Sequence, residues 1–142
     1  MTGAPVGHHL IDTSVWLDVL PRNAAYAALR ARVDAILQAR TGVMVGVVRA
    51  ELLRGARNEQ QYRRLDRLIG ALPVIATGED DWALAGRLGF ELRRQAVTVA
   101  IPDLLIAAIA VANADGGLTV LHRDRHFDLI AQRSSLKVES HL

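Results

Sequence analysis

Short apolar segments alternate with longer segments of helical periodicity along this chain, and this alternation constrains the fold more than any other feature. Residues 8–12, 43–47 and 118–122 are apolar runs of strand length, and residues 73–76 and 136–140 are weaker strand candidates. Strands that alternate with helices predict a mostly parallel sheet covered by helices on both faces. The sequence therefore predicts an α/β fold, a three-layer α/β/α arrangement with a short, mostly parallel central sheet.

The helical segments differ in how much apolar surface they carry. Residues 23–40 form an amphipathic helix with an apolar face at helical spacing. Thr77 and Asp80 have the spacing of a capping box, which predicts the start of another helix. Residues 101–114 are apolar nearly all round, so we expect a central helix, and the run is too short to span a bilayer. Other helices are expected before Pro21, around Glu51, over 59–70 and over 124–132.

The composition is typical of one globular domain over residues 1–142. Hydrophobic residues make up 51% of the chain and charged residues 23%, which argues against disorder. The chain has no cysteine, which excludes disulfides and thiolate sites and fits a cytoplasmic protein. The N-terminal segment lacks a basic region followed by a long apolar run, so we expect no secretory leader. Lys137 is the only lysine among 17 basic residues; arginine pairs well with phosphate, which slightly favours a nucleic-acid partner.

Acidic residues follow the expected strands at one edge of the sheet. Asp12 comes directly after the first strand, and Glu51 lies in the helix after the second. Asp103 lies at the start of the expected central helix. Asp124 follows the expected strand over 118–122. Ligands of open α/β sheets bind outside the carboxyl ends of the strands, where these acids are expected to meet. Taken singly, each acid is explained by helix capping, by a first-turn position or by solvation.

Taken together, the four acids predict a metal site. Carboxylates that converge on one crevice repel each other, and a divalent cation relieves that repulsion. Oxygen ligands at an open edge suit Mg²⁺ or Mn²⁺, which share their coordination with a substrate phosphate. Such ions can activate water and stabilise the leaving oxygen of a phosphodiester. With Asp12 used in this way, we expect Thr13 and Ser14 to cap the first helix.

Four segments carry a resemblance to a known family. "LIDTSVWLD", "VVRAELLRG", "IPDLLIAAIAV" and "VLHRDRHFDLIA" resemble, in order and spacing, the signature segments of PIN-domain ribonucleases, specifically the VapC toxins of bacterial toxin–antitoxin pairs. The resemblance implies a Mg²⁺- or Mn²⁺-dependent endoribonuclease with RNA as its substrate. It implies a homodimer, no membrane association, and a VapB antitoxin that blocks the site by forming a hetero-oligomer. It assigns the catalytic and metal-binding roles to Asp12, Glu51, Asp103 and Asp124.

Several neighbouring residues have open roles. Many relatives carry an acid where this chain has His126, which leaves one anionic ligand fewer, and a small hydroxyl residue where it has His122. His126 is an accessory candidate for phosphate binding, metal binding, proton transfer or plain packing. Thr13 is a second accessory candidate, through a hydroxyl that holds Asp12 or a bound water, or it is an ordinary cap. Arg123 and Arg125 flank Asp124 and are RNA-binding candidates or solvated surface charges.

Aromatic side chains and two other function classes complete the alternatives. Trp16 and Trp82 fall within apolar helical faces, so we expect them in the core rather than stacked on bases. A phosphoacceptor signalling domain also clusters aspartates at strand ends, but it needs a lysine late in the sheet, and this chain offers only Lys137. A non-catalytic interaction module would keep the fold without binding divalent ions. Intact acids at all four positions argue against it.

Overall fold

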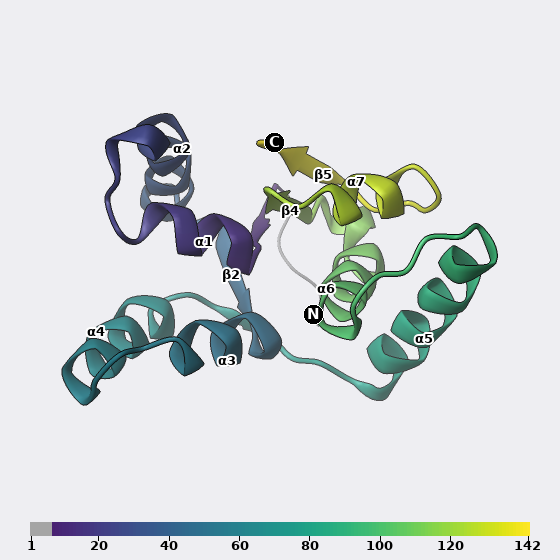
Figure 1. Ribbon diagram of the computed structural model, residues 1–142, viewed down its shortest axis with the longest axis horizontal. Coiled ribbons are helices and arrows are strands. Elements are labelled where there is room, and N and C mark those ends of the chain that lie inside the picture. The colour runs from purple at the N-terminus through teal and green to yellow at the C-terminus, as the bar shows by residue number, and fades with distance from the viewer. Residues whose placement is uncertain (1–6) are drawn as a thin grey trace.

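The computed structural model describes residues 7–142, which form a five-stranded parallel sheet with helices on both faces (Figure 1). The strands lie in the order β3–β2–β1–β4–β5, so the first strand of the chain is the central one. All four strand pairs are parallel, which confirms the predicted α/β fold with a short central sheet. The strands are β1 (His9–Ile11), β2 (Gly42–Val45), β3 (Val74–Ile75), β4 (Thr119–His122) and β5 (Val138–Ser140).

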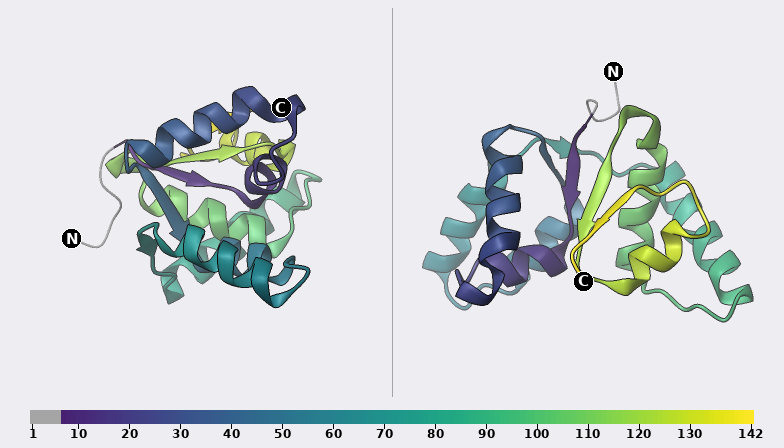
Figure 2. Two further views of the ribbon diagram at one scale, coloured as in Figure 1. Left: turned by 90° about the vertical axis from the view of Figure 1, so that its left-hand side faces the viewer. Right: turned by 90° about the horizontal axis from the view of Figure 1, so that it is seen from above.

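The helices divide between the two faces of the sheet according to the direction in which the chain moves. From β1 the chain moves outward to β2 and β3, then returns past β1 to β4 and β5. Because parallel crossovers are right-handed, this reversal moves the later helices to the opposite face, as Figure 2 shows. One face carries α1 (Thr13–Val19), α2 (Ala27–Gln38), α3 (Gly46–Arg54) and α4 (Glu59–Gly70). The other carries α5 (Glu79–Arg94), α6 (Ile101–Ala112) and α7 (Arg125–Ala131).

The reversal of strand order places a ligand-binding edge between β1 and β4. In open α/β sheets the crevice lies where neighbouring strands lead the chain in opposite directions. Here the chain passes from β1 to β2 on one side of β1, whereas β4 lies on the other side of β1. Register pairs Ile11 with Leu121, so the residues that follow these two strands emerge side by side. The fold therefore brings the segment after β1 close to the segment after β4.

The helix α6 lies in the core, as its composition predicts. Every residue from Leu104 to Ala110 is buried, and α5 packs along this helix. Gly89 of α5 makes that packing possible, since a Cβ there would lie 2.8 Å from Cδ1 of Leu104. Gly86, one turn earlier on α5, has no such neighbour within 4 Å.

Some expected element boundaries and one expected burial are wrong. The helix expected from residue 23 starts as a short 3₁₀ turn, η1 (Ala24–Tyr26), capped by Asn23. The capping box expected at Thr77 and Asp80 lies one residue later, where the Gly78 N–H donates to Asp81 at 2.8 Å. Glycine has no side chain to complete the pattern that the sequence rule searches for.

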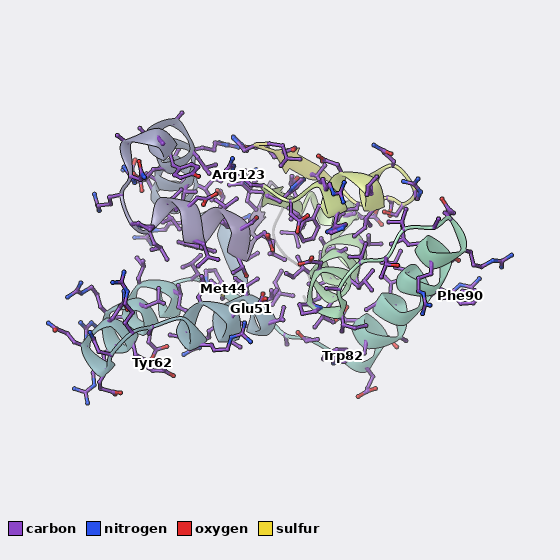
Figure 3. The ribbon with its side chains drawn as sticks, in the orientation of Figure 1. Met44, Glu51, Tyr62, Trp82, Phe90 and Arg123 are labelled. Carbon is purple, nitrogen blue, oxygen red and sulfur yellow. The ribbon has the colours of Figure 1, made fainter. Side chains whose placement is uncertain are left out.

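The two tryptophans also differ from each other. Trp16 is buried, as expected, whereas half of Trp82 is exposed on α5, so the prediction that it lies in the core is wrong (Figure 3). Residues 118–122 and 43–47 were expected as strands; β4 begins at Thr119, and β2 ends at Val45 because Gly46 already starts α3. A second short 3₁₀ turn, η2 (Ala114–Gly116), follows α6.

Two expectations concern what surrounds this fold. The expected absence of a secretory leader rests partly on residues 1–6, which lie outside the described residues. Among residues 7–142, none of the helices combines the length and apolar character that a membrane crossing requires. The single domain over 1–142 stays a prediction.

The two α5 glycines give a matched test of the packing. Gly86→Ala adds helix propensity in open space and should stabilise the protein by ~0.5–1 kcal/mol. Gly89→Ala gains the same propensity but pushes on the buried Leu104, so its free energy of unfolding should fall at least ~1 kcal/mol below that of Gly86→Ala. Urea unfolding of both variants measures the difference. Equal stabilities would contradict the close α5–α6 contact.

Candidate metal centre

Asp12 lies just beyond the central strand and caps the helix that follows it. Its backbone N–H donates to the Leu121 carbonyl at 2.9 Å, which continues the contact between β1 and β4. Its Oδ2 accepts two hydrogen bonds from Ser14, from the backbone N–H at 3.1 Å and from the hydroxyl at 2.6 Å. Asp12 is only 3% exposed. Burial raises the pKa of its carboxyl, although the hydrogen bonds from Ser14 oppose the rise.

Ser14 connects the segment after β1 to the segment after β4. Its hydroxyl donates to Asp12 and accepts the backbone N–H of Arg123 at 3.1 Å. Asp12, and not Thr13 or Ser14, is the N-cap of α1. The expectation that Thr13 and Ser14 would take over the capping is therefore wrong, because a carboxylate can cap a helix with one oxygen and keep its place at the sheet edge.

Glu51 reaches the same region from α3. Its Oε1 accepts a hydrogen bond from the Thr13 hydroxyl at 2.9 Å, a contact that joins α3 to the first residue of α1. In Figure 3, Glu51 lies near the centre of the view, on α3 and below α1. In the described part of the chain, Glu51 is therefore held by Thr13 and forms no ion pair with Arg49 or Arg54; Arg49 pairs with Asp66 at 2.7 Å instead.

Asp103 is the acid that its surroundings stabilise least. It lies half-buried in the first turn of α6, after Pro102. Among residues 7–142 no hydrogen bond or ion pair to its carboxylate is found. Burial raises its pKa to about 6, and the negative charges of Asp12, Asp124 and Glu51 add to the rise. The influence of all three acids on Asp103 means that the four sequence-predicted carboxylates share one electrostatic environment.

Asp124 caps α7 and is held in place by a buried histidine. Its Oδ1 accepts the backbone N–H of His126 at 2.9 Å, and its own N–H donates to Nδ1 of His122 at 3.0 Å. Because a backbone N–H can only donate, Nδ1 of His122 accepts and the ring proton lies on Nε2. Nε2 lies 3.0 Å from Asp128, which also accepts a hydrogen bond from Ser140.

His122 is therefore a positioning residue that sequence reasoning left without a role. It is fully buried and packs against the ring of Phe127, with ring centroids 5.2 Å apart. A series of hydrogen bonds runs from Ser140 through Asp128 and His122 to the backbone N–H of Asp124, and it links β5 to the site. The signal in the sequence is the histidine two residues before the acid, a spacing that lets Nδ1 reach that backbone N–H.

Asp103, Asp124 and His126 form a group that fits a divalent cation. One ligand atom from each side chain lies within 4.8 Å of those of the other two. All three side chains are partly buried, and within the described part of the chain the Asp103 carboxylate accepts no hydrogen bond. The carboxylate oxygens suit Mg²⁺ and Mn²⁺, and a positive ion would offset the burial and the neighbouring negative charges that raise the Asp103 pKa.

The two arginines beside Asp124 have different surroundings. Arg123 pairs with Asp18, donates to the His141 carbonyl at 3.0 Å, and lies 5.0 Å from the ring centre of Tyr26 (Figure 3). These contacts favour a structural role that ties the β4–α7 loop to α1. Arg125 is exposed, which leaves it available to an approaching phosphate.

Comparison with known proteins decides the family. The PIN domain family matches residues 9–132. The chain belongs to the PIN-domain family. Ribonuclease VapC11 of Mycobacterium tuberculosis is 32% identical over 133 residues, which cover 92% of this chain and 97% of VapC11. Ribonuclease VapC51 of the same organism is 33% identical over 124 residues, covering 87% and 85% of the two chains. The resemblance to VapC ribonucleases is confirmed, and within the PIN-domain family this chain belongs with them.

A solved structure agrees with this assignment at the level of the fold. A chain in the crystal structure of VapBC2 from Rickettsia felis, bound to a DNA fragment from their promoter, superposes with a TM-score of 0.74. The two chains are 22% identical, and the match covers 93% of this PIN-domain chain and 97% of the other.

The phosphoacceptor alternative lacks its lysine. Lys137 donates to the Ala114 carbonyl at 2.8 Å. Ala114 precedes β4, so this contact lies at the amino edge of the sheet, opposite the carboxylates. The one lysine of the sequence is thus held away from the acids.

Substitution of His122 tests its control of the Asp124 backbone. His122→Phe keeps a ring but removes the acceptor of the Asp124 N–H, so that amide should exchange with solvent faster and stability should fall by ~1–3 kcal/mol. His122→Asn keeps an acceptor oxygen close to the position of Nδ1, and it should preserve the slow exchange of the Asp124 amide. Amide hydrogen exchange measured by NMR separates the two variants. Equal exchange rates at Asp124 would remove the positioning role.

Charge at Asp103 should cost stability when no metal is present. Its pKa rises from 3.8 to about 6 on folding, so the folded protein binds more protons and loses stability as pH rises through this window. In a chelating buffer at pH 7.5, Asp103→Asn should raise the free energy of unfolding by about 1 kcal/mol, because solvent screens a half-buried carboxylate. The gain should shrink toward zero as pH falls from 6 to 4. Asp80→Asn, at an exposed first-turn position of α5, should give no such pH-dependent gain.

Proposed function

We propose that this PIN-domain protein is a metal-dependent endoribonuclease toxin of a type II toxin–antitoxin system. Asp12, Glu51, Asp103 and Asp124 form its catalytic site and hold Mg²⁺, for which Mn²⁺ substitutes. The observation that carries the proposal is the convergence of Asp103, Asp124 and His126, whose ligand atoms lie within 4.8 Å of one another. The half-buried Asp103 carboxylate has no hydrogen-bond donor among residues 7–142, and the charges of three further acids add to the rise of its pKa. The names of the VapC relatives support RNA as the substrate.

The chain's own residues fix the acids in place for hydrolysis. A bound divalent ion supplies Lewis-acid chemistry, which favours the ionised form of water and stabilises negative charge on phosphate oxygens. Ser14 holds Asp12, Thr13 holds Glu51, and His122 holds the backbone of Asp124. These hydrogen bonds fix the positions of the three acids, although the negative charges of the acids repel each other.

The reaction itself needs no covalent protein intermediate. The oxygen of a water molecule forms a new bond to phosphorus as the water loses a proton to solvent. The bond from phosphorus to the leaving ribose oxygen breaks, and that oxygen takes up a proton from solvent. Exposed Arg125, beside Asp124, is positioned to contact a neighbouring phosphate of the RNA. Thr13 takes part only by holding Glu51.

The partners proposed for the toxin are a second copy of the chain and a VapB-type antitoxin that blocks the acidic site. The VapBC complex of similar fold supports the antitoxin. Large apolar side chains remain exposed on α5, among them Trp82 and Phe90, each about half exposed, and these offer a surface for one of the partners. Genes of such pairs are adjacent, so a short neighbouring gene for a DNA-binding protein would support the assignment.

RNA cleavage by the purified, antitoxin-free protein tests the function. Folded RNA should be cut with Mg²⁺ or Mn²⁺ and left intact with a chelator. Asp12→Asn and Asp103→Asn should each lower the rate by on the order of 10²-fold or more, because each removes a charged ligand. Asn at position 12 retains an oxygen that can cap α1, so loss of activity there would not reflect a lost cap.

The controls separate the site from the fold and from the rival function. Asp80→Asn alters an exposed acid on α5 and should cut at the parent rate. If both site variants also cut at the parent rate, the proposed site is wrong. Failure of the parent protein to bind any divalent ion would favour a non-catalytic interaction module instead.

A further inference from the structure

One member of the acidic group is a histidine, and its ring is close to both neighbouring acids. Nδ1 of His126 lies 3.1 Å from Oδ1 of Asp124. One ring nitrogen of His126 also lies within 4.8 Å of a carboxylate oxygen of Asp103. About a third of the His126 side chain is exposed, so the ring stands at the border of the site and not in the core.

The backbone of α7 places this ring. His126 is the second residue of α7, and its backbone N–H donates to the same Asp124 oxygen that its ring approaches. The cap of α7 and the His126 ring therefore lie on the same side of the first turn of α7. Asp103, from the neighbouring helix α6, lies beside them. Within residues 7–142, Asp124 is the one side chain found to form an ion pair with the ring.

A ring so placed has two physical explanations. In the first, a protonated His126 is a simple ion-pair partner of Asp124, and a cation in the site would displace it. In the second, a neutral His126 is itself a ligand and contributes a nitrogen to an otherwise all-oxygen group. Both would bring the ring close to the two acids, since a positive ring also favours the ionised form of Asp103. The spacing supports the second, because a nitrogen and two carboxylate oxygens that lie within 4.8 Å of one another can share a single ion.

We propose, resting on the metal site of the proposed function, that His126 is a nitrogen ligand which gives this site a preference for Mn²⁺ over Mg²⁺. Mn²⁺ binds oxygen ligands but, as a transition-metal ion, also accepts an imidazole nitrogen, whereas Mg²⁺ takes oxygen ligands almost exclusively. A neutral nitrogen in place of a carboxylate also lowers the negative charge of the group by one. That loss weakens a Mg²⁺ site, which depends on charge, more than a Mn²⁺ site, which gains the nitrogen.

Spectroscopy of bound Mn²⁺ tests the ligand directly and without any activity measurement. Electron spin-echo spectra of the full-length protein with Mn²⁺ should contain modulation from a coordinated ¹⁴N nucleus. His126→Gln and His126→Asp should lose it, whereas His141→Gln, which changes a histidine paired with Glu139 on β5, should keep it. Mn²⁺ bound without nitrogen modulation in the parent protein would overturn the inference and leave the carboxylate site standing.

Affinities give the second measurement. Mn²⁺ binding followed by the loss of the free-ion signal, with Mg²⁺ as competitor, gives the ratio of the two dissociation constants. His126→Asp, which makes the group all oxygen, should shift this ratio toward Mg²⁺ by about tenfold or more. His126→Gln should weaken Mn²⁺ more than Mg²⁺. An unchanged ratio in both variants contradicts the inference.

The outcomes distinguish this inference from the proposed function. If the parent protein binds neither ion, the metal site and the inference fail together. If both ions bind and cleavage requires them, but His126 affects neither the spectrum nor the ratio, the inference alone fails. Circular dichroism establishes that each variant is folded, and the spectrum of the parent protein is decisive even where a variant does not fold.

Discussion

The N-terminal caps of α1 and α7 are the interactions on which the arrangement of the acids depends. Asp12 and Asp124 follow adjacent strands at the point where strand order reverses, and each accepts the N–H of the residue two positions later. A cap of this kind contributes ~1 kcal/mol, and it fixes the carboxylate relative to the strand that precedes it. Since a carboxylate has two oxygens, the cap uses one and leaves a charged group at the crevice. Capping and metal binding are thus compatible roles of the same side chain, and a fold that needs the caps also carries the charge.

The other two acids come from opposite faces of the sheet, and this is why the group needs a counter-charge. Glu51 belongs to α3 and Asp103 to α6, so both helix layers direct a carboxylate toward the same edge. Glu51 has a donor in Thr13, whereas Asp103 has none among the described residues, and its pKa is raised to about 6. Burial and the charges of the three other acids together disfavour the ionised form of Asp103. A stable domain without a ligand at this edge would gain by replacing Asp103 with a neutral residue, so its presence indicates a function that needs the charge.

The sequence predicts which acids meet, but it does not predict what holds them. Strand and helix periodicity place Asp12, Asp103 and Asp124 at one edge, because the carboxyl ends of parallel strands share an edge whatever their order. The contact of Ser14 with the Arg123 backbone depends instead on the register between β1 and β4, which one sequence does not reveal. Glycine caps such as Gly78 carry no side-chain signal, which shifts a predicted helix start by a residue. The exposure of Trp82 follows from which side of α5 packs on α6, and amphipathic spacing alone leaves that side ambiguous.

Charge around the site explains how an acidic crevice can serve an anionic substrate. A phosphate that approaches the group meets four carboxylates, and two nearby arginines are already engaged, Arg49 by Asp66 and Arg123 by Asp18. Only Arg125, among the arginines that flank Asp124, is exposed without such a pairing in the described part of the chain. A bound cation would add positive charge among the acids themselves, so it would influence substrate binding as well as hydrolysis. Ligands that set which cation binds, such as the nitrogen of His126, would therefore influence both steps.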